Sequence, residues 1–189
     1  MVIRILRARE SREKRYKQLS EIYQGTILAL TMNIPGAQKN TKSAMKAFNI
    51  GLDIMNKKLS SRRVNVLKHE VNVTDDGPQA CWVIDTPPIS IKKWAMEVEQ
   101  VHPLGRLYDF DVLDENLCPI HREAIGASRR ACLICGQVAH VCARSQKHSY
   151  LDLHKRIDEM VQDYMKVLDM RGYRSEKALP KEAKAYAKS

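Results

Sequence analysis

The sequence of 189 residues lacks the features that most directly assign a chain to a membrane, an export route or a common enzyme class. No apolar run approaches the ~18 residues of a membrane span, and Met1–Arg15 is too charged for the apolar part of a signal peptide. A Walker loop, a dinucleotide-binding fingerprint and a nucleophilic triad are also absent from the sequence. We therefore expect a cytoplasmic protein without membrane attachment, whose chemistry depends on less common motifs.

Aromatic residues are scarce, at 6% of the chain, and they do not cluster. Proteins that hold single-stranded nucleic acid stack the bases on aromatic side chains, so this class is not favoured. The net charge of +10 is concentrated at the two ends: residues 1–17 carry seven Lys or Arg against two Glu, and residues 171–189 carry six against two. Such ends are either solvated tails or surfaces that attract an acidic partner.

Cysteine occurs in an odd number, five, without an export signal, so a disulfide framework is not expected. Cys132 and Cys135 have the spacing of a zinc knuckle, and Cys142 follows after six intervening residues. Nearby residues that could complete a tetrahedral site are Cys118, His121, His140 and His148. A zinc site at Cys132, Cys135 and Cys142 is one interpretation, and buried free thiols are the other.

Apolar periodicity predicts helices and strands in mixed order. Helices are expected at residues 8–24, 42–60, 88–101 and from about 149, and strands at residues 26–32, within 64–73, at 81–85 and at 105–113, with 114–148 irregular. This order predicts a single α+β domain over residues 1–170, with a mixed sheet and packed helices. Residues 171–189 are expected to form a basic C-terminal tail.

Two acidic residues, Asp109 and Asp111, lie two positions apart in the strand expected at 105–113. Residues at this spacing share one face of a strand, so their carboxylates should lie together while Phe110 and Val112 point into the core. Mg²⁺ takes such hard oxygen ligands and also binds substrate phosphates, as phosphoryl and nucleotidyl transfer require. The alternative is an exposed acidic strand face without a function.

Several groups that commonly bind phosphate follow this strand. They are Arg129, Arg130, Arg144, Ser145, Lys147 and His148. Arginine forks match phosphate oxygens two at a time, which favours their use at polyphosphate sites. The turn at Asn33–Asn40, with Gly36 and Lys39, could add backbone N–H groups and a cation. Ordinary solvation of these surface side chains is the alternative.

Taken in order, these segments resemble one known family. The matching stretches are Ala8-Arg9-Glu10, Asn33-Ile34-Pro35-Gly36 with Lys39-Asn40, His102-Pro103-Leu104-Gly105-Arg106-Leu107-Tyr108-Asp109-Phe110-Asp111-Val112, Arg129-Arg130-Ala131-Cys132-Leu133-x-Cys135, and Cys142-Ala143-Arg144-Ser145-x-x-His148-Ser149. They resemble the apo-citrate lyase phosphoribosyl-dephospho-CoA transferases, also called holo-acyl-carrier-protein synthases of citrate lyase. The resemblance covers about residues 8–170.

The resemblance implies a reaction in which a serine hydroxyl of the apo acyl carrier protein (γ) subunit of citrate lyase attacks the α-phosphate of 2′-(5″-triphosphoribosyl)-3′-dephospho-CoA. Diphosphate leaves, and the carrier partner is expected to be acidic. Because the implied reaction is similar in type to nucleotidyl transfer, the resemblance also suggests a nucleotidyltransferase-like fold by analogy. The candidate catalytic residues are Asp109, Asp111 and Arg106, with magnesium at the two aspartates. The candidate substrate-binding residues are Asn33, Gly36, Lys39, Arg129, Arg130, Arg144, Ser145 and His148. The alternative function, from another class, is a zinc-knuckle module that binds nucleic acid.

Overall fold

The computed structural model describes residues 1–126 and 129–172. Its helices are α1 (Val2–Tyr23), α2 (Lys42–Ser61), α3 (Pro88–Val101), α4 (Ala139–Arg144) and α5 (Tyr150–Met170), its strands are β1 (Thr26–Met32), β2 (Val66–Thr74), β3 (Gly77–Ile84) and β4 (Tyr108–Leu113), and two short 3₁₀ helices are η1 (Gly105–Leu107) and η2 (Arg122–Ile125). Almost all of the tail expected at residues 171–189 lies outside the described residues.

The four strands form one sheet in the order β2-β3-β1-β4. All three neighbouring pairs run antiparallel, so the expected mixed sheet is corrected to an antiparallel one, while the expected single α+β domain is confirmed. A tight turn at residues 75–76 joins β2 to β3, and so short a connection permits only an antiparallel pair.

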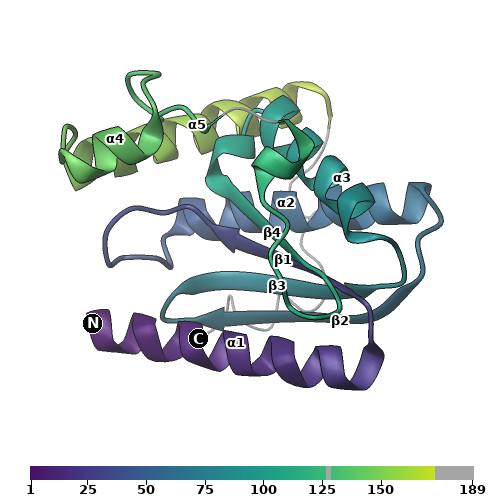
Figure 1. Ribbon diagram of the computed structural model, residues 1–189. Coiled ribbons are helices and arrows are strands. Elements are labelled where there is room, and N and C mark those ends of the chain that lie inside the picture. Colours follow the sequence, from purple (N-terminus) through teal and green to yellow (C-terminus); the bar gives the residue numbers. More distant parts are fainter. Residues whose placement is uncertain (127–128, 173–189) are drawn as a thin grey trace.

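The main core lies between the sheet and the helices α2, α3 and α5, which cover one face of it (Figure 1). Alternate strand residues such as Leu28, Trp82 and Phe110 point into this core, and Phe48 of α2 and Ile157 of α5 meet them there. Period-two burial of this kind is what a sheet covered on this face requires. Among residues 1–126 and 129–172, no helix combines the length and apolar character needed to cross a membrane.

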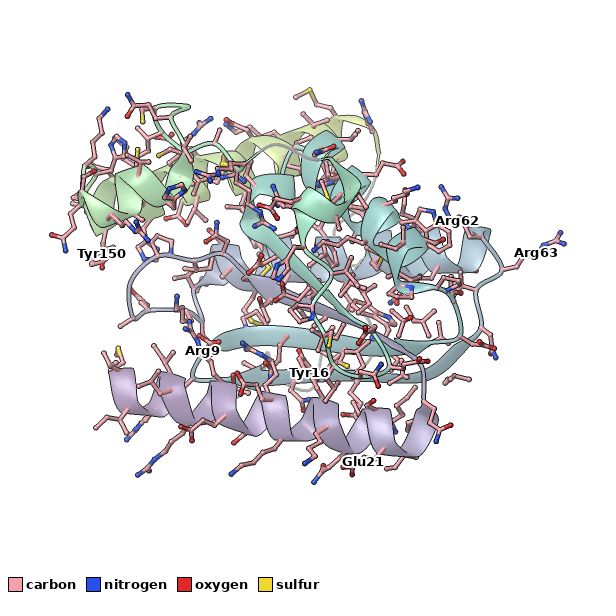
Figure 2. All side chains as sticks on the ribbon, viewed as in Figure 1. Arg9, Tyr16, Glu21, Arg62, Arg63 and Tyr150 are labelled. Carbon is pink, nitrogen blue, oxygen red and sulfur yellow. The ribbon has the colours of Figure 1, made fainter. Side chains whose placement is uncertain are left out.

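Helix α1 covers the opposite face of the sheet (Figure 1). Leu19 packs there against Ile27 and Val83, and Tyr16 projects from α1 toward the strands (Figure 2). The helix begins at Val2, six residues before the expected start. The apolar residues of this added part are mostly exposed. The apolar contact of α1 is therefore confined largely to its second half.

Ion pairs fix the first half of α1. Asp76, in the turn between β2 and β3, accepts hydrogen bonds from Arg9 at 3.0 and 3.1 Å and from Arg12 at 2.9 Å. Arg15 pairs with Glu70 of β2. Burial opposes ionisation of Asp76, but the two guanidinium groups outweigh it and lower the pKa of this carboxyl. The Arg-rich start of the chain is thus part of the fold and not a free tail.

Candidate active site

Strand β4 sends its alternate residues to opposite faces of the sheet. Tyr108 and Phe110 are buried in the main core, whereas Asp109 and Asp111 face the side on which α1 lies. Both carboxylates therefore share one face, as their spacing predicts. Asp111 keeps contact with solvent, yet the protein around its carboxyl and the neighbouring Asp109 carboxylate raise its pKa.

A cavity of about 1320 Å³ opens beside Asp109. Its walls come from the end of β1, η1, η2, the segment after η2, α4 and the start of α5. The predicted site residues that line it are Asn33, Arg106, Asp109, Arg129, Arg130, Cys132, Cys142, Arg144 and His148, and Arg122 is a fifth arginine in the same lining. Five guanidinium groups against two acidic side chains, Asp109 and Glu123, make the cavity cationic, which suits a polyanionic ligand.

A buried carboxylate, Glu99 of α3, connects the cavity to the body of the protein. Its oxygens accept hydrogen bonds from Arg130 at 2.5 Å, from Arg122 at 2.7 Å and from the Phe110 backbone N–H at 2.9 Å. Arg130 also pairs with Asp109 at 3.0 Å. Burial raises the pKa of Glu99, and the adjacent Arg130 and Arg122 oppose that rise. Arg130 therefore orients Asp109 from a position that Glu99 fixes.

The other three predicted arginines differ in how they are held. Arg106 donates to the Ala131 carbonyl oxygen, and burial together with Arg130 and Arg122 lowers its pKa. Arg129 and Arg144 are exposed, and none of the described residues forms a hydrogen bond or ion pair with either side chain. These two guanidinium groups are consequently the ones available to a ligand.

Of the two predicted polar residues in the turn after β1, Asn33 lines the cavity and Lys39 does not. The Asn33 backbone N–H donates to the Leu107 carbonyl at 2.8 Å, which fixes this turn against η1 and places Asn33 in the lining. Lys39, by contrast, donates to the Ile34 carbonyl at 2.5 Å and does not line the cavity. Burial lowers the pKa of Lys39. The Lys39 side chain therefore stabilises the turn in which it lies and does not face the cavity.

Gly36 and Ser145 also lie outside the cavity lining. Gly36 has a φ of +70°, which favours glycine, and a Cβ there would lie 3.5 Å from the ring of Tyr150, a lining residue. The Ser145 hydroxyl donates to the Val141 carbonyl at 2.9 Å, within its own helical turn. Both residues shape the segments that carry lining side chains.

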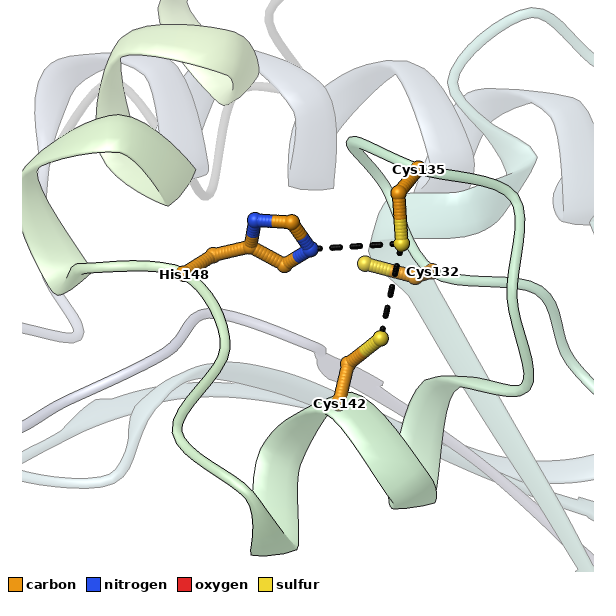
Figure 3. Close-up of side chains that lie close together, drawn as sticks. All are labelled: Cys132, Cys135, Cys142 and His148. Atoms are coloured by element: carbon orange, nitrogen blue, oxygen red, sulfur yellow. Dashed lines mark hydrogen bonds between the residues drawn. The ribbon is translucent and has the colours of Figure 1, made fainter.

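Three cysteines and one histidine converge next to the cavity. The side chains of Cys132, Cys135, Cys142 and His148 point toward one another (Figure 3), and their donor atoms all lie within 4.8 Å of each other. His148 Nε2 is 3.3 Å from Cys135 Sγ, which is 3.5 Å from Cys142 Sγ. The three predicted cysteines are thus together, and His148 joins them. Four such donors could hold a metal ion.

Sequence reasoning missed Glu99, Arg122 and the buried Lys92, which donates to the Phe110 carbonyl at 3.0 Å. A signal for two of them exists in the periodicity of α3. Lys92 and Glu99 stand seven residues apart, on the same side of the helix as the buried Ala95. A charged residue at a core-facing helical position requires a partner when buried, so it indicates a polar network.

The fold and the cavity together define a class: an α+β protein with an arginine-lined cavity that suits a polyanionic ligand, beside a strand that carries two carboxylates. Comparison with known proteins makes the assignment more particular. The family model described as apo-citrate lyase phosphoribosyl-dephospho-CoA transferase matches residues 1–164. The chain belongs to this family of transferases.

Individual relatives agree with the family match. A probable apo-citrate lyase phosphoribosyl-dephospho-CoA transferase of Vibrio cholerae is 35% identical over 139 residues, covering 73% of this chain and 78% of the relative. A probable enzyme of the same name from Streptococcus pyogenes is 32% identical and covers 85% and 84%. The Escherichia coli apo-citrate lyase phosphoribosyl-dephospho-CoA transferase is 28% identical and covers 84% and 87%. The resemblance found in the motifs is confirmed.

Proposed function

We propose that this chain transfers the phosphoribosyl-dephospho-CoA group from 2′-(5″-triphosphoribosyl)-3′-dephospho-CoA to a serine of the acyl carrier protein subunit of apo-citrate lyase, with release of diphosphate. The observation that carries the proposal is the arginine-lined cavity beside Asp109 in a chain of this transferase family. A triphosphate is a compact polyanion, and several guanidinium groups converging on one cavity match it in charge and geometry.

The arginines divide into two roles in this proposal. Arg129 and Arg144, which are exposed in the lining, bind the triphosphate directly, and Arg106 assists from η1. Arg130 acts through its contacts with Glu99 and Asp109, so it is a positioning residue. Charge on the departing diphosphate is then stabilised by groups that are already in place before the reaction.

Magnesium is the metal we propose for Asp109 and Asp111. The donor set fits, because two hard carboxylate groups share one strand face and the neighbouring Asp109 carboxylate disfavours ionisation of Asp111. When bound, the ion would neutralise charge on the reacting phosphate. Cys132, Cys135 and Cys142, for which the sequence left zinc binding and free thiols as alternatives, take no part in this step. The transfer needs no thiol, because the attacking group is the carrier's serine hydroxyl.

The carrier would approach from the side of α1 in this proposal. The exposed surface of that helix carries Arg4, Arg7, Lys14 and Lys17. Such a surface attracts an acidic protein at long range and makes association sensitive to salt. In this proposal the basic residues of α1 have two roles. Arg9, Arg12 and Arg15 hold the helix on the sheet through their ion pairs, and the exposed basic residues attract the partner.

The direct test is mass spectrometry of the purified apo carrier after incubation with this protein, magnesium and the triphosphoribosyl precursor. The expected result is a mass gain equal to the prosthetic group, together with release of diphosphate. Salt-dependent binding of RNA or DNA without any mass gain would instead support the nucleic-acid-binding alternative, which the family match does not favour.

A further inference from the structure

The cluster of Cys132, Cys135, Cys142 and His148 has no role in the proposed transfer. Its members come from a turn, from α4 and from the residue before the N-cap of α5, and they meet at one point (Figure 3). All the cysteines of the described structure are free thiols, so no disulfide explains the convergence. The convergence of four side chains from three separate segments therefore needs another explanation.

We infer that these four side chains form a structural zinc site in which His148 is the fourth ligand. Three thiolates and one imidazole are a donor set that Zn²⁺ prefers. With Zn–S bonds of ~2.3 Å and Zn–N bonds of ~2.0 Å, a tetrahedral site has ligand–ligand edges of roughly 3.5–3.8 Å. The observed edges of 3.5 Å between Cys135 and Cys142 and 3.3 Å between His148 and Cys135 are close to these values.

The backbone between Ala131 and Val138 reverses direction and brings Cys132 and Cys135 close together. The Cys132 N–H donates to the Gln137 carbonyl at 2.5 Å, and Ala131 pairs with Val138 in an antiparallel bridge. Between them Gly136 has a φ of +70°, with nothing within 4 Å of where a Cβ would stand. The glycine is therefore needed for chain reversal and not for close packing, and the reversal brings both sulfur atoms to the same side.

The segment that contains the cluster has almost no apolar interior. Among its described residues, 114–126 and 129–148, Cys142 is the one that is buried. A stretch of this length without a core of its own requires a staple to hold a fixed shape. Because metal binding contributes free energy to folding, zinc at this point would supply it.

The position of the cluster gives zinc a defined role. Cys132 follows Arg129 and Arg130, Cys142 shares the short helix α4 with Arg144, and His148 directly precedes the N-cap residue of α5, Ser149. All three connected segments line the arginine-rich cavity. The ion therefore fixes the cavity wall that carries Arg144, and it acts without touching the substrate.

The test is metal analysis of the full-length protein purified without chelators. We expect about one zinc atom per chain, reduced at least tenfold in Cys135→Ser and in His148→Ala. Two matched controls are Cys118→Ser and His140→Ala, because both residues are exposed and neither belongs to the cluster. These controls should keep the wild-type zinc content.

A second measurement needs only the wild-type protein, so it holds even where a ligand variant fails to fold. Titration of the native protein with a mercurial thiol reagent should release zinc in step with modification of the cluster thiols, and the melting temperature should fall with it. Cobalt replacement should give the absorption of a tetrahedral thiolate site.

Three outcomes would overturn the inference: less than about one zinc atom per ten chains in protein produced with added zinc, full zinc content in both ligand variants, or a disulfide between Cys135 and Cys142 in freshly purified protein. None of these readouts measures the transferase reaction, so failure here and failure of the proposed function are distinguishable.

Discussion

The body of the protein and the segment at residues 114–148 are built on different principles. The sheet and its helices enclose a continuous apolar core that includes Trp82, Phe48 and Tyr108, each almost fully buried. The segment buries one side chain among its described residues, Cys142. It is attached to the body by polar links from Arg122 and Arg130 to Glu99, by backbone bonds that continue β4, and by Ile120 and Leu133, which pack against the main core.

The two regions supply different kinds of functional side chain. The carboxylates Asp109 and Asp111 stand on a rigid strand, whereas Arg129 and Arg144 stand on the segment without its own core. Two carboxylates that share one magnesium ion need a fixed spacing, which a strand provides. Groups that bind a large anion can come from a segment that is attached to the body by polar links and a few apolar contacts. The following changes test that division, from the largest expected effect to the smallest.

Replacing Asp111 by Asn tests the contribution of the rigid strand. The protein should remain folded, because the side chain is solvent-exposed and no hydrogen bond to it is formed by the residues described. Transfer should fall on the order of 100- to 1000-fold, since loss of a magnesium ligand removes several kcal/mol of transition-state stabilisation. The measurement is the rate of carrier modification at saturating magnesium. Asp53→Asn, on the surface of α2, is the control, and equal rates for the two variants would remove Asp111 from the site.

Replacing Glu99 by Gln tests the link between the two regions. Its carboxylate is 6% exposed and bonds to Arg122 and Arg130, so breaking the pair should lower the free energy of unfolding by about 3 kcal/mol. Glu97→Gln is the matched control, because Glu97 stands on the same helix with a side chain 54% exposed and should cost under ~1 kcal/mol. Urea unfolding measures both. Equal losses would mean that the segment does not depend on Glu99.

A pH experiment tests the body alone. His102 accepts from the Leu104 N–H at Nδ1 and bonds to Tyr164 at 3.0 Å, and burial lowers the pKa of its imidazole to about 4. The unfolded chain, with a His pKa near 6.5, then binds more protons than the folded one between these values. Stability is therefore lost as the pH falls from about 6.5 to about 4, by about 2 kcal/mol from this residue at pH 5.

The measurement compares urea unfolding at pH 7.5 and pH 5 in wild type and in His102→Gln. The variant should lose less stability on acidification than the wild type does. His121→Gln is the control from the other region, because the His121 side chain is exposed there. An unchanged difference between the two pH values in His102→Gln would contradict the assignment.

The sequence predicted the body of the protein better than it predicted the segment at residues 114–148. Most of the body was predictable, because β1 is a short apolar run, α2 and α3 have apolar periodicity, and the two aspartates share a face as their spacing requires. The convergence of His148 with the cysteines was not, since it depends on the path of an irregular chain. Glu99 was missed because its core-facing position in α3 indicates that it has a polar partner but not which residue that partner is. The antiparallel sheet was missed because periodicity does not fix strand direction.

The smallest expected effect concerns the segment itself. Arg144→Lys keeps the charge but loses the planar fork, so affinity for the triphosphoribosyl precursor should fall about tenfold, or about 1.4 kcal/mol. Calorimetric titration measures it, with Arg156→Lys of α5 as the control outside the arginine-lined cavity. Zinc content should stay at the wild-type level in Arg144→Lys, whereas His148→Ala should lose both zinc and affinity although Arg144 is intact. That contrast separates a residue that binds the ligand from one that holds the binding residue in place. Wild-type affinity in Arg144→Lys, with unchanged zinc, would assign the triphosphate to the other arginines.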